Sequence, residues 1–370
     1  MLVTILVFIA ILSVLVLVHE LGHFLVAKKL GIKVEEFGFG LPPKALSFKK
    51  GETVYSINWL PIGGFVKLYG EDEAGSGKIQ NSKFKIQNSD KHRAFFARPA
   101  WQRILVVTAG VVMNFLLAVV IISFLFSAVG VSIPGDKVTI SNVLKNSPAE
   151  KSGLKIGDIV ESVNGKEVKE PGQLILITKE NLGKEIALKI KDKDAKEKEV
   201  RVTPRKTYPS NEGPMGVSLS LSYKIIKYPW YQAPFLGTLE ALQTSWLIVS
   251  GLFSMLYQFI FHGITPKGVA GPVGIAQLTG QFVQIGPYAV LSFVSMLSLN
   301  LAILNILPFP ALDGGRLAFI LVEVIFGKKV SIKYESYAHA AGMALLIGLI
   351  LLVTINDLIR VFTGQPILPK

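Results

Sequence analysis

The chain of 370 residues contains no cysteine and only five histidines. The absence of cysteine excludes disulfide bonds, thiolate zinc sites, iron–sulfur clusters and cysteine nucleophiles, so any metal must be held by histidine and oxygen ligands. Charged residues are also scarce, at 18% against 50% apolar residues, a composition that is rare in water-soluble domains and indicates a membrane protein. The net charge of +13 lies on lysines and arginines spread through loops, without a nucleic-acid recognition motif. We therefore expect a lipid bilayer, and no nucleic acid, as the partner.

Five apolar stretches approach the roughly 20 residues that a helix needs to cross a bilayer. They cover about residues 1–27, 104–130, 241–261, 287–308 and 338–359. The first is not expected to be a signal peptide, because it has no basic start and continues directly into a histidine motif. The stretch 241–261 is interrupted by glutamine, serine and threonine, so hydropathy alone leaves open whether it crosses the membrane or lies on its surface.

The first stretch contains the motif His19-Glu20-Leu21-Gly22-His23. On a helix, this spacing places both imidazoles on one face, one turn apart, where they can bind one zinc ion. Glu20 lies beside them and could take a proton from water at the metal. The alternative is a structural cluster without a metal, in which these polar side chains hydrogen-bond to one another inside a helix bundle. Ionisable side chains in an apolar span are costly and rarely lack a functional partner, which favours the metal site.

A catalytic zinc ion needs a third protein ligand and an open position for water. No histidine follows His23 at a suitable distance, so the ligand must come from elsewhere in the chain. The best candidate is Asp313, in the sequence NILPFPALDGG at 305–315, where the fourth apolar stretch ends. The prolines and glycines there break the helix, which is tolerated at membrane depth where the backbone lines a cavity.

The distribution of basic residues predicts the orientation of the chain. Lysine and arginine are concentrated in segments 28–103 and 328–333, so we expect both segments to be cytoplasmic and both chain ends to lie outside. Asp313 can meet His19 only if 287–308 also ends near the cytoplasmic side, which requires 241–261 to lie on the outer surface. The sequence therefore predicts four transmembrane helices.

These motifs resemble those of the site-2 protease family of intramembrane zinc metalloproteases, most closely its bacterial RseP-type members. HELGH at 19–23 and NILPFPALDGG at 305–315 match the two motifs of the family, and residues 147–165 are similar to its PDZ core. The resemblance covers nearly the whole chain. It departs from the family at Val111, where the family usually has proline.

The resemblance implies one zinc ion per chain, bound by His19, His23 and Asp313. It also implies that Glu20 is the general base, and that Asn300 and Asn305 bind the substrate backbone or the developing oxyanion.

The charged region from about 131 to 228 suits a small PDZ-like module outside the membrane. Strands are predicted at 137–143, 158–163, 185–190 and 199–202, and helices at 148–152 and 172–181. A PDZ groove can bind a peptide or a C-terminus by strand addition. The alternative is a steric filter that admits only substrates whose outer domains have been trimmed.

The cytoplasmic segment 31–70 contains two strand-like runs, 54–60 and 65–69, whose apolar content predicts a hairpin dipping into the membrane. A substrate helix must be unwound before its peptide bonds can be attacked. We expect the hairpin edge at Gly63, Gly64 and Phe65 to hold the unwound substrate as an added strand. Residues 71–92 are expected to form a loop.

The expected fold is thus a multi-pass α-helical membrane protein, with four transmembrane helices, a membrane-associated β-hairpin and an inserted α+β PDZ-like domain. Its expected parts are 1–130 with the first two spans, 131–228 with the extracytoplasmic PDZ-like domain, 229–286 with an interfacial helix, and 287–370 with the last two spans.

The expected function is that of an intramembrane zinc endopeptidase in a bacterial cytoplasmic (inner) membrane. It would cleave single-pass membrane proteins in regulated intramembrane proteolysis, and the resemblance implies substrates such as anti-sigma factors or remnant signal peptides. The alternatives are a membrane-anchored quality-control metalloprotease and a non-catalytic PDZ scaffold.

Overall fold

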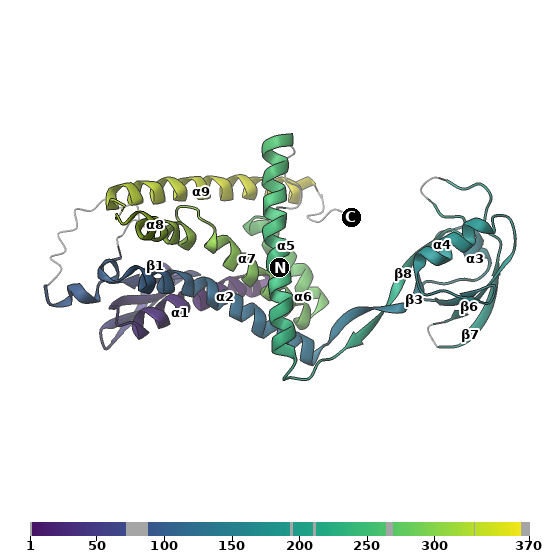
Figure 1. Cartoon of the computed structure of the whole chain (residues 1–370), viewed down its shortest axis with the longest axis horizontal. Coiled ribbons are helices and arrows are strands. Elements are labelled where there is room, and N and C mark those ends of the chain that lie inside the picture. Colours follow the sequence, from purple (N-terminus) through teal and green to yellow (C-terminus); the bar gives the residue numbers. More distant parts are fainter. Residues whose placement is uncertain are drawn as a thin grey trace. The chain divides into compact units, whose positions relative to one another are not determined.

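The structure is a computed structural model that describes residues 2–71, 88–192, 195–209, 212–263, 269–328 and 330–363 (Figure 1). The chain divides into two compact units, of which the smaller is Gly130–Tyr228 and the larger comprises the segments on either side of it. Within the described residues of the larger unit, five helices are long and apolar enough to cross a membrane. They correspond to the five predicted stretches and are α1 (Leu2–Lys29), α2 (Ala100–Ala128), α5 (Ala233–His262), α7 (Pro287–Ile306) and α9 (Ile332–Thr363).

Helices α1, α2 and α7 form the centre of the larger unit. A glycine allows the close approach of α1 and α2, because a Cβ atom on Gly22 would collide with the backbone carbonyl of Ala109. Further along the same helices, a buried cluster joins Ile11 and Leu15 of α1 to Ile121 of α2 and Val294 of α7. This packing fixes the face of α1 that carries the histidine motif.

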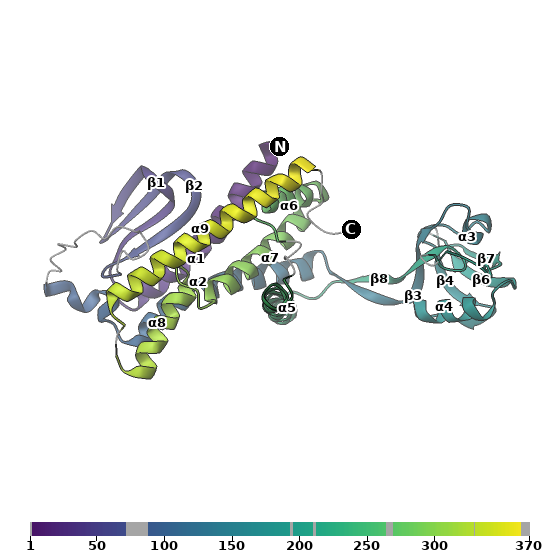
Figure 2. The same cartoon turned by 90° about the horizontal axis from the view of Figure 1, so that it is seen from above.

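Helix α5 runs across the direction of the other long helices. Figure 1 shows it crossing them, and Figure 2 shows it end-on while α1, α2, α7 and α9 extend along the view. It packs on α2 and α7 through Ala241, which contacts the buried cluster around Ala118 and Leu299. Its large apolar side chains, such as Trp246 and Phe261, are exposed. An apolar surface of this extent indicates contact with lipid or with another protein.

Strands β1 (Val34–Lys50) and β2 (Thr53–Leu68) form an antiparallel sheet in which each strand contributes two segments. Segment 34–39 pairs with 54–57 on one side and with 64–68 on the other. The prediction that the runs 54–60 and 65–69 pair with each other is therefore wrong. Segment 34–39 lies between them, and Gly38 within it leaves room for the ring of Phe65. Among the described residues, 64–68 has a strand partner on one side only and forms an edge of the sheet.

The chain after this sheet is described only in part. Of the predicted loop 71–92, residues 72–87 lie outside the described residues. The chain is described again from the 3-10 helix η2 (Asn88–Arg93), which is followed by η3 (Phe95–Ala97) and α2.

The smaller unit is an antiparallel sheet with two short helices and its own core. The strand order is β7-β6-β4-β3-β8, with β5 beside β4. The predicted strands and helices are present, whereas β8 was not predicted although Val217–Ser222 alternates apolar residues with serine. The elements are β3 (Val131–Val143), α3 (Pro148–Lys151), β4 (Ile159–Val163), β5 (Lys166–Glu167), α4 (Pro171–Glu180), β6 (Ile186–Lys191), β7 (Glu197–Val202) and β8 (Val217–Ile226).

Two shorter helices of the larger unit, α6 (Pro272–Ile285) and α8 (Asp313–Phe326), are not among the expected elements. The side chain of Asp357 on α9, which is 2% exposed, accepts hydrogen bonds from the backbone N–H groups of Gly271 and Gly274 at 2.9 and 2.8 Å. It therefore caps the N-terminus of α6 from a distant part of the chain. Helix α8 continues the chain after α7 and begins at the predicted third metal ligand.

Candidate active site

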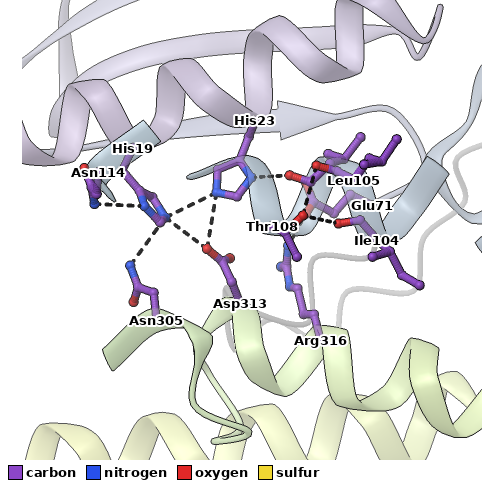
Figure 3. Close-up of polar contacts among 11 residues, drawn as sticks. His19, His23, Glu71, Ile104, Leu105, Thr108, Asn114, Asn305, Asp313 and Arg316 are labelled. Carbon is purple, nitrogen blue, oxygen red and sulfur yellow. Dashed lines mark hydrogen bonds and ion pairs between the residues drawn. The ribbon is translucent and has the colours of Figure 1, made fainter. Parts of the chain in front are cut away.

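Helix α1 places the two histidines of the HELGH motif side by side, as their spacing predicts. His19 and His23 are 6% and 9% exposed, and their Nε2 atoms lie 3.2 Å apart. The rings meet edge to face, with centroids 4.8 Å apart. Both Nε2 atoms point toward the start of α8 (Figure 3).

Asp313 reaches the histidines because the chain reverses sharply between α7 and α8. Helix α7 ends at Ile306, and after an irregular turn α8 begins at Asp313 itself. Gly314 makes the reversal possible, because a Cβ atom there would collide with the backbone carbonyls of Ile306 and Leu307. As a result, Oδ2 of Asp313 lies 3.0 Å from Nε2 of His19 and 3.3 Å from Nε2 of His23.

These three atoms have the spacing and the chemistry of a zinc site. Zinc bonds of about 2.0–2.1 Å in a tetrahedral site place neighbouring ligand atoms about 3.3–3.4 Å apart, close to the 3.0–3.3 Å found here. Nδ1 of His23 donates to the carbonyl of Val106 at 2.8 Å, so in the neutral ring Nε2 carries a lone pair. Oδ2 of Asp313 is buried and accepts no well-formed hydrogen bond from the described residues. Lone pairs that face one another in this way call for a cation, and the residues fit zinc.

Residues of α2 hold the two histidines in place. The carbonyl of Val106 fixes the ring of His23, and the side-chain amide of Asn114 lies with Nδ2 3.2 Å from Nδ1 of His19. Gly110 lies directly against both rings, because a Cβ atom on it would come closer than 3.0 Å to each of them. Such supporting contacts orient metal ligands, and the contact with Val106 also sets the tautomer of His23 that leaves Nε2 free to bind a metal. His19 has the same tautomer when the amide of Asn114 presents Oδ1, which has no other partner among the described residues, to the Nδ1–H group.

A cavity of about 230 Å³ opens beside the three candidate ligands. Glu20 lines it together with His23 and Asp313, so the candidate base faces the same space as the candidate metal site. Arg316, one turn after Asp313, forms an ion pair with Glu71, and both residues line the same cavity (Figure 3). The lining of the cavity therefore includes charged side chains, and its apolar residues come from several elements, including Phe65, Val66 and Leu68 of β2 and Met343 of α9.

The remaining predicted site residues differ in how near they lie to the metal site. Nδ2 of Asn305 is 3.4 Å from Nε2 of His19, whereas the amide of Asn300 donates to Met296 within its own helix at 2.9 Å. A Cβ atom on Gly64 would lie 3.5 Å from Cγ of Glu20, and Phe65 lines the cavity. Gly63 has a φ of 85° and ends the irregular part of β2 just before the edge segment.

Three residues of this site escaped the prediction: Gly110, Asn114 and His339, which lines the cavity from α9. Gly110 lies next to Val111, and nothing in the sequence pattern there indicates that it touches the histidines. His339 is separated from Asp313 by the whole of α8, and no motif contains it.

Known proteins are similar to this chain over nearly its whole length. Residues 7–349 match the profile of Peptidase family M50. The chain is 31% identical to the regulator of sigma-W protease RasP of Bacillus subtilis, over 97% of this chain and 99% of that protein. It is 32% identical to the zinc metalloprotease RasP of Geobacillus kaustophilus, over 96% of this chain and 97% of that protein. Among solved structures, the PDZ domain of an SdrC-like protein of Listeria monocytogenes matches 24% of this chain and 93% of its own, at 20% identity and a TM-score of 0.21.

Proposed function

Because the chain belongs to Peptidase family M50, the site-2 proteases, we propose that it cuts single-pass membrane proteins within their membrane spans. It is a zinc metalloprotease and a multi-pass membrane protein. The observation that carries the proposal is the position of the candidate metal site. His19 and His23 lie on α1, which is apolar and long enough to cross a membrane, and they meet Asp313 beside a cavity that His23 and Asp313 line.

We assign the binding of one zinc ion per chain to His19, His23 and Asp313. When bound, zinc supplies a Lewis acid that polarises the scissile carbonyl and activates water. Glu20 faces the same cavity and is the general base, which takes the proton of the attacking water and returns it to the leaving amine. Asn305, near Nε2 of His19, has an amide that can donate to the oxyanion that develops on the substrate. Asn300, whose amide donates to Met296, is assigned to the substrate backbone farther along the span.

The edge segment 64–68 of β2 is the proposed docking strand for the unwound substrate. Its residues Phe65, Val66 and Leu68 line the cavity beside Glu20, and its outer side has no strand partner among the described residues. Added to this edge, a substrate backbone would run past the candidate metal site in an extended form. Glu71 supports the strand end, because it accepts a hydrogen bond from the N–H of Leu68 at 3.3 Å and pairs with Arg316 of α8.

The proposed topology has four spans, α1, α2, α7 and α9, with α5 lying in the outer membrane surface. The course of α5 across these helices supports the surface position (Figures 1 and 2). Both chain ends and the unit 130–228 are then extracytoplasmic.

In the smaller unit we propose a groove for an extended peptide between β8 and α4. Among the described residues, β8 pairs only with β3, so its other edge is available to an added strand. A peptide end trimmed by an earlier protease is the proposed occupant. The relative in Bacillus subtilis is named a regulator of sigma-W protease, which supports anti-sigma factors as one substrate class, beside remnant signal peptides.

The proposal is tested by comparing two substrates that share one cleavable sequence. In the first, the sequence forms the span of a single-pass protein in lipid vesicles with the purified enzyme. In the second, it is a soluble unfolded peptide. We expect efficient cleavage of the first alone, at bonds inside the span mapped by mass spectrometry. Equal cleavage of both would instead indicate a quality-control protease whose site faces water.

A further inference from the structure

The turn between α7 and α8, which precedes Asp313, contains a residue with a strained backbone. Ala311, two positions before Asp313, has a φ of 84°, in the left-handed region that favours glycine. An alanine keeps this conformation only where surrounding contacts impose it. The hydrogen bonds that the turn makes within itself use the N–H groups of Phe309 and Leu312, so the N–H of Ala311 is left for another partner.

That partner comes from α9. The N–H of Ala311 donates to Nδ1 of His339 at 2.9 Å. His339 is 4% exposed, and its ring packs against the ring of Phe319 in α8 at 5.6 Å between centroids. Because Nδ1 accepts a hydrogen bond from the backbone N–H, the neutral ring carries its proton on Nε2.

A second contact holds α9 close to the same turn. A Cβ atom on Gly342, one turn after His339, would collide with the backbone and side chain of Pro310. A larger residue there would push α9 away and lengthen the hydrogen bond to Ala311. Two residues on one face of α9, His339 and Gly342, thus contact the turn that contains the left-handed Ala311.

We propose that His339 is a positioning residue for the third zinc ligand: through Nδ1 it holds Ala311 in its left-handed conformation, so that Asp313 faces His19 and His23. The inference rests on the proposed function only in taking Asp313 as a zinc ligand. It makes α9 part of the metal site although no residue of α9 is a ligand.

The test measures zinc affinity of the full-length purified protein by competition with a chelator, using three substitutions of His339. His339→Leu removes the acceptor and is expected to weaken zinc binding about 10-fold to 100-fold, the range for lost supporting contacts. His339→Asn places an amide oxygen near the position of Nδ1 and is expected to retain most of the affinity. His339→Gln places it near Nε2 and is expected to behave like His339→Leu. If the leucine variant does not fold, the zinc affinities of the Asn and Gln variants are compared, and a higher affinity for His339→Asn supports the proposal.

A rescue variant separates positioning from general packing. Glycine adopts a positive φ without steric cost, so Ala311→Gly in the His339→Leu background is expected to restore most of the zinc affinity. Unchanged affinity in His339→Leu, or a loss in all three variants that Ala311→Gly does not restore, would overturn the proposal. Failure of the proposed function has a different signature, because the wild type would then bind zinc without cutting a membrane span.

Discussion

Gly110 determines how closely α2 approaches the two histidines, and no larger residue fits in its place. A Cβ atom there would press on Nε2 of His23 and on the ring of His19. We expect Gly110→Ala to weaken zinc binding about 10-fold or more, because both ligands must move. Gly348→Ala is the matched control, since a Cβ atom on this helical glycine of α9 meets nothing within 4 Å. Equal zinc affinity of the two variants, measured by chelator competition, would contradict the packing described here.

The residues of the site differ in how readily the sequence reveals them. His19, Glu20 and His23 follow from a local rule, because a spacing of four residues on a helix is independent of the rest of the fold. Asp313 was identified from helix-breaking residues, and the structure places it 3.0 Å from His19. Gly110 and His339 act across helix contacts between distant segments, and such contacts leave no periodic pattern in a single sequence.

Glu52, in the turn between β1 and β2, links the sheet to the end of α1 and to η2. Its Oε1 accepts hydrogen bonds from Arg93 at 2.8 Å and from Lys28, at the end of α1, at 3.0 Å. The bond from Arg93, followed by that from Lys28, lowers the pKa of Glu52 from 4.5 to about 2. A carboxylate with a lowered folded-state pKa stabilises the fold above its unfolded-state pKa, and this stabilisation is lost as the pH falls toward the folded-state pKa.

We therefore expect the contact between this turn and the end of α1 to loosen as the pH falls from about 4.5 to about 2. Limited proteolysis around residues 50–53 over this range measures the loosening. Glu52→Gln, which cannot ionise, is expected to be loose at every pH in the range. The same pH response in wild type and variant would show that another group is responsible.

At the scale of elements, the edge segment 64–68 carries the proposed contact with the substrate backbone. Proline lacks the N–H that an added strand needs and fixes φ, so we expect Phe65→Pro or Lys67→Pro to reduce cleavage. The expected reduction is about 5-fold to 10-fold, equivalent to one or two lost backbone hydrogen bonds. Zinc content is expected to remain unchanged. Cleavage rate and bound zinc are measured on the same purified samples.

The opposite edge of the sheet supplies the control for this prediction. Segment 46–50 pairs with 53–57 and does not line the cavity, so Lys49→Pro is expected to leave cleavage near the wild-type rate. Folded proline variants at Phe65 and Lys67 that cleave as fast as Lys49→Pro would remove the docking role of the strand.

The sequence predicts the long helices better than it predicts the sheet. Long apolar runs identify α1, α2, α5, α7 and α9 because lipid requires continuous apolar helices. The pairing of β1 with both halves of β2 depends on Gly38, whose missing side chain makes room for Phe65. In the sequence, the glycines of 38–40 resemble a turn more than the centre of a sheet.

At the scale of the whole molecule, the account requires that α5 lies along the outer surface of the membrane. Because the chain has no cysteine, each introduced cysteine is the only thiol in the protein. Tyr231 lies just before α5 and His262 at its end, and both are exposed. We expect a membrane-impermeant maleimide added outside intact cells to label Tyr231→Cys and His262→Cys alike. Labelling of His262→Cys only after the cells are opened would show that α5 crosses the membrane, and the four-span topology would be wrong.

The central claim is that a zinc ion held by His19, His23 and Asp313 serves a proteolytic reaction in which Glu20 is the base. The most direct test compares wild type and Glu20→Gln for cleavage of a single-span substrate in detergent, with bound zinc measured in both. We expect Glu20→Gln to lose cleavage by about 100-fold or more while it keeps wild-type zinc content, since glutamine cannot accept the proton. Equal cleavage by the two proteins would contradict the mechanism.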